Sequence, residues 1–205
     1  YNSPICIGET IQFSLPSSPN ANYAWTGPNG FTSSIHNPSI SNATSANQGL
    51  YNVEITFDGL DCVLDTFATV IVNVPPTIQL NSITNVNCFN GNTGAISITA
   101  SGNGPFTYAW SNGNTSANPT GLTAGAYTVT VTNSNTCTAT QTFNVTQSPQ
   151  LTGSIQNQTN YFGYNVSCFE NNADGSTLVT VSGGTPGYTY LWNNGMTNNF
   201  IFSLT

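Results

Sequence analysis

Cysteines are the residues of this sequence whose type and spacing point most directly to chemistry. Their positions recur: Cys6 and Cys88 each stand before an early predicted strand, and Cys62 and Cys137 each stand at the start of a late one. We therefore predict the disulfides Cys6–Cys62 and Cys88–Cys137, each closing a loop of about 50 residues and stabilising a small module by about 4 kcal/mol. Cys168 repeats the position of Cys88, and we expect its partner to lie beyond this fragment.

Other constellations of side chains give no prediction of catalysis. A nucleophile needs a base beside it, and the single imidazole, His36, lies between turn residues. The cysteines also lack the close spacing of zinc ligands. We therefore predict a non-enzymatic protein with no catalytic residues, no metal and no cofactor. Asp58 and Asp61 fall on a predicted hairpin turn, where Asp is favoured for its own backbone hydrogen bonds, and whether Ca²⁺ binds there stays open.

The charge composition excludes several classes of partner. The chain has no Lys or Arg and only seven Asp and Glu residues. Without cations it cannot neutralise phosphates, so we expect no nucleic acid and no attraction to anionic lipid headgroups. No apolar run is long enough for a membrane span, so we expect no membrane insertion in this segment. Recurring cysteine pairs indicate an oxidising, extracellular location.

Alternating residues predict β-strands throughout the chain. Residues 127–132 read Tyr-Thr-Val-Thr-Val-Thr, which places valines on one face and threonines on the other. Residues 49–55 form a similar stretch, and a Tyr-x-Trp precedes each copy. A third Tyr-x-Trp occurs at residues 190–192. A tryptophan that recurs on an alternating strand is normally buried, so the predicted core residues are Trp25, Trp110, Trp192, Tyr51 and Tyr127.

Prolines divide the chain into three predicted segments. Pro75 and Pro76 stiffen one boundary, and Pro149 marks another. The segments are residues 1–74, 75–147 and 148–205, and we call them the first, second and third segments. Short strands separated by Gly, Pro and Asn turns, with no helical period, predict tandem Ig-like β-sandwich modules in an extended, rod-like array.

The second and third segments resemble the SprB repeat of Bacteroidetes cell-surface adhesins. In the second segment the matching motifs are Cys-Phe-Asn-Gly at residues 88–91, Trp-Ser-Asn-Gly at 110–113, Gly-Leu-Thr-Ala-Gly-Ala-Tyr at 121–127, and then Cys137. Residues 182–192 repeat the part that precedes the tryptophan, with one residue inserted. The first segment is similar to the Ig-like or PKD-like modules that accompany such repeats.

The resemblance implies a very long protein of the bacterial outer surface, exported by type IX secretion and used in adhesion or gliding. We therefore expect a structural stalk or filament segment. Its expected partners are neighbouring modules of the same chain, copies of itself in a fibre, and surface glycans. The alternatives are a carbohydrate-binding module, which requires a solvent-facing Trp or Tyr cluster, and an ice-binding segment, which requires a flat threonine face.

Overall fold

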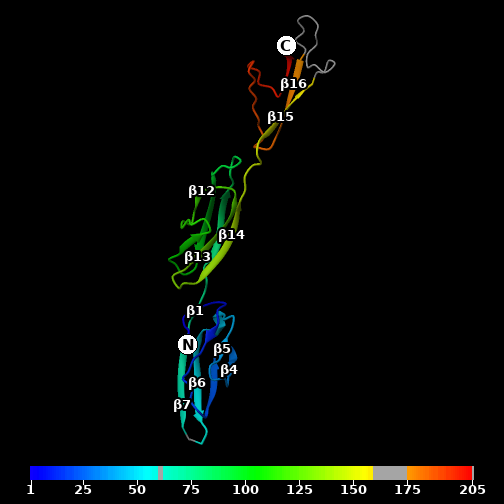
Figure 1. Cartoon of the computed structure of the whole chain (residues 1–205). Helices are drawn as coiled ribbons and strands as arrows, with labels where there is room; N and C mark the ends of the chain where they lie inside the picture. Colours follow the sequence, from blue (N-terminus) through cyan, green and yellow to red (C-terminus); the bar gives the residue numbers. More distant parts are fainter. Residues whose placement is uncertain (60–61, 159–174, 205) are drawn as a thin grey trace. The chain divides into compact units, whose positions relative to one another are not determined.

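The computed structural model describes residues 1–59, 62–158 and 175–204, and these residues form an all-β protein (Figure 1). The all-β, Ig-like fold class predicted from the sequence is confirmed. In the first segment the elements are β1 (Ile5–Cys6), β2 (Ile11–Gln12), β3 (Ala21–Gly27), η1 (Pro28–Gly30), β4 (Phe31–Ser33), β5 (Ser39–Ile40), η2 (Ser45–Asn47), β6 (Gly49–Phe57), β7 (Val63–Val70) and β8 (Val72–Asn73). In the second they are β9 (Thr77–Thr84), β10 (Gly94–Ser101), β11 (Thr107–Trp110), β12 (Thr120–Leu122), β13 (Gly125–Thr132) and β14 (Thr138–Val145). In the third they are β15 (Thr152–Asn157), β16 (Gly175–Ser182) and β17 (Phe200–Leu204).

The strands form small sheets that stay within their segments. The first segment contains the sheet β4-β3-β6-β7, the antiparallel pair β2-β5 and the parallel pair β1-β8. The second contains the sheets β12-β10-β9 and β11-β13-β14, and the third contains β15-β16-β17. By its contacts the chain divides into two compact units. One comprises Tyr1–Asn81, Ile98–Ala117 and Thr128–Thr142, and the other Ser82–Ser97, Asn118–Tyr127 and Phe143–Thr205. The domain boundaries expected from the prolines stay predictions.

The alternation of inward and outward side chains that the sequence predicts is present in β6 and β13. Alternate residues of β6 are buried, and so are Tyr127, Val129 and Val131 of β13. The threonines between these β13 residues are half-buried on the other face, where Thr128 and Thr142 hydroxyls lie 2.7 Å apart in a hydrogen bond. Threonine suits this position because its branched side chain packs well on a pleated surface while its hydroxyl stays hydrated.

Aromatic rings fill the core of the first segment. The Phe13 ring lies 4.8 Å from that of Trp25 and 4.8 Å from that of Tyr51, a spacing at which aromatic pairs attract beyond their burial. Gly27 lies against Tyr51, and a Cβ added there would clash with Tyr51 Cδ1. Only glycine leaves room for the ring at this place. The buried cluster consists of Ile5, Ile11, Phe13, Trp25, Ala43, Tyr51, Val53, Ile55, Ala68, Val70 and Val72.

The third segment repeats the strand register of the second. Gly94 pairs with Leu122 between β10 and β12, and Gly175 pairs with Leu204 between β16 and β17. Ser203, with a φ of 58°, stands in the left-handed conformation at the position of Gly121, whose φ is 71°. Residues 200–204 are therefore the counterpart of β12, a strand that the sequence pattern does not place.

The two buried tyrosines that were predicted as core residues share one hydrogen-bond pattern. Tyr51 Oη donates to the carbonyl of Asn47 at 2.8 Å, and Tyr127 Oη donates to that of Thr123 at 3.0 Å. Each bond runs four residues upstream, as in the tyrosine corner of Ig-like sandwiches. Burial raises the pKa of Tyr51, and the side chain of Asn47 acts in the opposite direction.

We expect Tyr51→Phe to lower the free energy of unfolding by about 1–3 kcal/mol, because a buried carbonyl loses its partner. Urea unfolding followed by tryptophan fluorescence measures the loss. Tyr1→Phe is the matched control, since Tyr1 is 57% exposed.

The wild type and the Tyr51→Phe variant should also differ in how their free energy of unfolding depends on pH. The folded-state pKa of Tyr51 lies above its unfolded value, so the stability that depends on its proton is complete below about pH 10 and is lost as the pH rises through the folded pKa. The stability advantage of the wild type over Tyr51→Phe should therefore shrink above that pH. An unchanged advantage would contradict the role given to the buried hydroxyl.

Candidate functional site

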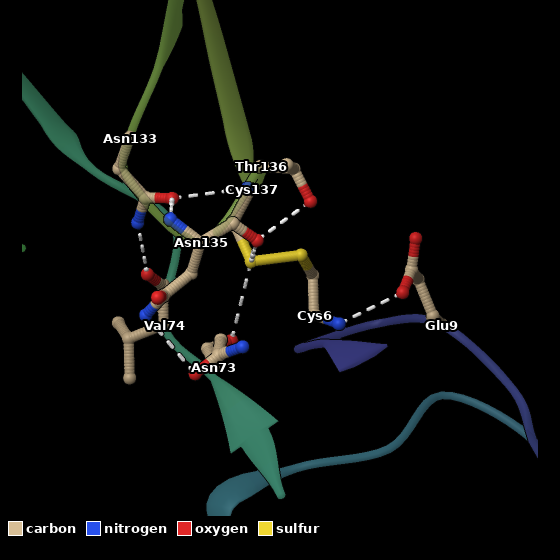
Figure 2. Close-up of a disulfide and its surroundings, with 8 residues drawn as sticks. All are labelled: Cys6, Glu9, Asn73, Val74, Asn133, Asn135, Thr136 and Cys137. Carbon is tan, nitrogen blue, oxygen red and sulfur yellow. Dashed lines mark hydrogen bonds between the residues drawn. A yellow bond between two sulfur atoms is a disulfide. The ribbon is translucent and has the colours of Figure 1, made fainter. Parts of the chain in front are cut away.

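A disulfide joins Cys6 to Cys137, across a sequence separation of 131 residues (Figure 2). The two Cα atoms are 5.6 Å apart. The predicted bonds Cys6–Cys62 and Cys88–Cys137 are therefore wrong. Cys62 and Cys88 are exposed free thiols, and Cys168 lies outside the described residues.

Strand topology explains why Cys6 and Cys62 do not pair. Cys6 ends β1, which runs parallel to β8 and reaches Asn73, where the chain leaves the first segment. Cys62 instead precedes β7 (Val63–Val70), whose first residue pairs with Thr56 at the far end of the sheet. The eight residues of β7 span roughly 26 Å, whereas a disulfide requires Cα atoms within about 7 Å.

The second predicted bond fails for a related reason. Cys137 stands directly before β14, at the start of that strand. Val86, two residues before Cys88, forms a parallel bridge with Gln147, beyond the end of the same strand. An early and a late cysteine of one segment thus belong to opposite ends of its last strand.

Asn133 organises the turn that carries Cys137. Its side-chain oxygen accepts hydrogen bonds from the backbone N–H groups of Asn135 and Cys137, both at 3.0 Å. Its Nδ2 donates to the carbonyl of Val74 at 3.0 Å, and the residue is only 5% exposed (Figure 2). One buried amide therefore holds the turn together and fixes it to Val74, the last residue of the first segment.

Further polar contacts connect β8 and β1 to the residues at the disulfide. Asn135 Nδ2 donates to Asn73 Oδ1 at 3.1 Å, and the backbone N–H of Cys6 donates to Glu9 Oε2 at 2.8 Å (Figure 2). Asn133 is not among the residues predicted from the sequence. Its spacing of four residues from Cys137 is the signal that could have identified it, since Asn favours turns by bonding its own backbone.

The chemistry of this site is covalent cross-linking. Cys137 is 1% exposed, which limits attack by external thiols because exchange requires access to the sulfur. The side chains at the disulfide are asparagines, a threonine, a valine and one glutamate, none of them arranged as a nucleophile with a base. The arrangement is that of a structural joint.

The remaining candidates for chemistry have structural contacts. His36 Nε2 lies 3.1 Å from the carbonyl oxygen of Pro16, and the centre of its ring lies 4.7 Å from that of Tyr23, with the two rings tilted to each other. Asp58 Oδ1 accepts a hydrogen bond from Asn22 Nδ2 at 2.8 Å, and Asp61 lies outside the described residues. Over the described part of the chain, no three His, Cys, Asp or Glu side chains gather where they could hold a metal ion.

Two of the three tryptophans are buried and unavailable for stacking on a sugar. Trp25 and Trp110 are 3% and 4% exposed. The prediction of a buried Trp192 is wrong, because this residue is half-buried. Trp110 ends β11 and pairs with Val129 of β13, whereas no strand forms at residues 188–192 and β17 pairs with β16. Trp192, Tyr190 and Leu191 therefore line an open pocket of about 190 Å³ with Ile155 and Val179.

Trp110 and Trp192 nevertheless begin the same hydrogen-bonded loop. The indole Nε1 of each donates to a carbonyl six residues later, in Ser116 and in Asn198, both at 2.8 Å. The carbonyl of each tryptophan accepts from the glycine three residues on, Gly113 or Gly195, both at 2.9 Å. Both glycines have a positive φ, of 82° and 83°. The two loops are thus copies of one structural repeat.

The model of the SprB repeat matches residues 80–115 and 164–197. The chain thus contains two stretches that are similar to the SprB repeat. The resemblance seen in the motifs is confirmed, and with the Ig-like fold it makes the chain a structural module of the surface-adhesin type. The SprB repeat implies a cell-surface protein, and such modules are typically non-enzymatic. In the described residues, no helix has the length and apolar character that a membrane crossing requires.

Solved structures that are similar to this chain include the four N-terminal Ig domains of Dscam1. An amphioxus IgVJ-C2 molecule is 20% identical, with a TM-score of 0.31, over 68% of this chain and 97% of that one. Three N-terminal domains of the bacteriophage RB49 outer capsid protein Hoc are 15% identical, with a TM-score of 0.37, over 92% and 69%. Titin A168–A169 is 17% identical, with a TM-score of 0.33, over 70% and 92%. No curated protein matches the chain.

Serine variants test the pairing of the cysteines. Cys137→Ser should free the Cys6 thiol for alkylation and lower the free energy of unfolding by up to about 5 kcal/mol in the chain-entropy description. Cys62→Ser is the matched control and should leave both quantities unchanged. Mass spectrometry of alkylated, non-reduced digests and urea unfolding measure them. A free Cys6 in the Cys62→Ser protein would restore the pairing first expected from the sequence.

Proposed function

We propose that this chain is a tension-bearing stalk segment of a large secreted adhesin on the bacterial outer surface, supporting adhesion or gliding. The observation that carries the proposal is the bond between Cys6 and Cys137, which spans 131 residues of sequence. The SprB repeats support a surface location, and their occurrence in type IX secreted adhesins supports the route of export.

The disulfide changes the path along which tension passes. Force that enters before Cys6 and leaves after Cys137 crosses the sulfur–sulfur bond and bypasses the residues between them. Residues 7–136 then form a closed loop that carries no load. Only the residues outside the loop, which include β14, remain on the loaded path. Most of the first segment lies inside the loop, so it keeps its fold while the stalk is stretched.

Single-molecule stretching tests this proposal. Pulled between its termini, the reduced chain should release about 450 Å more contour length than the oxidised chain, because 131 residues at about 3.3–3.6 Å each leave the closed loop. The Cys6→Ser variant under oxidising conditions should behave as the reduced wild type does. Equal lengths for oxidised and reduced wild type would overturn the proposal.

Self-assembly into fibres is a second candidate, favoured by the exposed edge strand β15. All six of its residues are exposed, and Ile155 is 67% exposed. Proteins commonly protect such edges with lysine, and this chain has none. Among the described residues no further strand pairs with the outer edge of β15, and such an edge beside an apolar side chain fits the pairing of one copy with another.

A lysine on this edge should prevent association between copies. We expect Ile155→Lys to stay monomeric at concentrations where the wild type forms oligomers or fibres, measured by light scattering and electron microscopy. Thr115→Lys is the matched control, because it adds the same charge at an exposed loop residue. Monodisperse wild-type protein at high concentration would remove this candidate and leave the stalk.

A further inference from the structure

Cys88 has the same local backbone as the bonded Cys6. The carbonyl of Cys6 accepts a hydrogen bond from Glu9 N at 3.1 Å, and that of Cys88 accepts from Gly91 N at 3.0 Å. The residue before each donor, Gly8 or Asn90, has a positive φ, of 91° and 58°. Both cysteines therefore begin the same type of four-residue turn.

The strand that precedes each turn is also equivalent. Ile5 pairs in parallel with Val72, and Val86 forms a parallel bridge with Gln147. In both segments the residues just before the early cysteine thus lie beside the place where the chain leaves the segment, in a strand pair at Ile5 and in an isolated bridge at Val86. The two registers differ, because Cys6 itself pairs with Asn73, whereas Cys88 stands two residues after the paired Val86.

A loop of the second segment supports the turn that delivers Cys137 to Cys6. The carbonyl of Asn103 accepts hydrogen bonds from both the backbone N–H and the hydroxyl of Ser134, each at 3.3 Å. Asn103 belongs to the Ser-Gly-Asn-Gly sequence of residues 101–104, which residues 182–185, Ser-Gly-Gly-Thr, repeat in the third segment.

The repeated loop lies beside Cys88. Thr185 Oγ1 donates to the carbonyl of Asn87 at 3.5 Å, and Gly184 N donates to the carbonyl of Pro149 at 2.8 Å. A pocket of about 240 Å³ opens here, with Cys88, Phe89, Pro149, Leu151 and Tyr188 among its lining residues. A turn held by residues 182–185, as residues 101–104 hold the turn of Cys137, would therefore lie at the Cys88 thiol.

We propose that Cys88 is a docking and cross-linking site for the turn cysteine of the SprB repeat that follows the second segment. In this scheme the cysteine near the first strand of each segment bonds the cysteine near the last strand of the next segment. Cys62, at the last strand of the first segment, would then bond the first-strand cysteine of a preceding segment. Two thiols lose two protons and two electrons as the sulfur–sulfur bond forms, and a low-molecular-weight disulfide takes them up and becomes two thiols.

Extending the chain tests this site directly. Because Leu204 occupies the register position of Leu122, a copy of residues 124–147 appended after Thr205 continues the third segment in register and supplies the missing turn cysteine. In oxidised glutathione, non-reduced peptide mapping should recover the appended cysteine bonded to Cys88, at least about tenfold in excess of any other pairing, because docking raises the effective concentration. The matched control carries serine at the appended cysteine and should leave Cys88 open to alkylation.

A second measurement uses the 205-residue chain unchanged. A peptide of residues 132–139 with an activated mixed disulfide at its cysteine should label Cys88 several times faster than Cys62, and a scrambled peptide should label the two alike. Pairing of the appended cysteine with Cys168, or equal labelling of Cys88 and Cys62 by the turn peptide, would overturn the proposal. The inference extends the proposed stalk, and its bond mapping is independent of the stretching experiment, so either can fail alone.

Discussion

The bond between Cys6 and Cys137 is the constraint on which the junction depends, and Asn133 makes that bond geometrically available. A disulfide forms only where two Cα atoms already lie within about 7 Å. The buried amide of Asn133 meets this condition by closing the turn through two backbone N–H groups and binding the carbonyl of Val74 with its own donor. Covalent and polar interactions therefore act together at one place.

At this junction side-chain amides form the polar contacts that charged side chains form in many proteins. In a chain with no Lys or Arg, the hydrogen bonds of buried polar groups in the described residues come from side-chain amides, hydroxyls and backbone, and Trp25 Nε1 is left without a partner. Asn47, for example, accepts hydrogen bonds from both the backbone N–H and the hydroxyl of Thr44. Amide contacts neither titrate nor weaken by the screening that salt imposes on exposed charges. The amide contacts of such a surface protein therefore persist when the pH or salinity of its surroundings changes.

The sequence predicts the strands and most of the core because both follow from alternation. Tyr51, Tyr127, Trp25 and Trp110 are buried as expected, since each stands at an inward position of a strand that is covered on that face. Trp192 has the same local sequence, but its burial depends on a neighbouring strand that residues 193–204 do not provide. The local sequence pattern identifies a candidate core position, but the side chain there is buried only when a neighbouring strand covers it.

The disulfide pairing could not be read from recurrence alone, because equivalent positions define two classes of cysteine without defining which members meet. The topology decides this. The early strand β1 runs parallel to the last strand, so Cys6 lies at the end where the chain leaves its segment. The late cysteine, Cys137, lies on the turn where the carbonyl of Val74 is bound, at the end where the chain enters the next segment. In this chain these two ends meet where the second segment follows the first, and the bond between Cys6 and Cys137 is thus a consequence of the strand order.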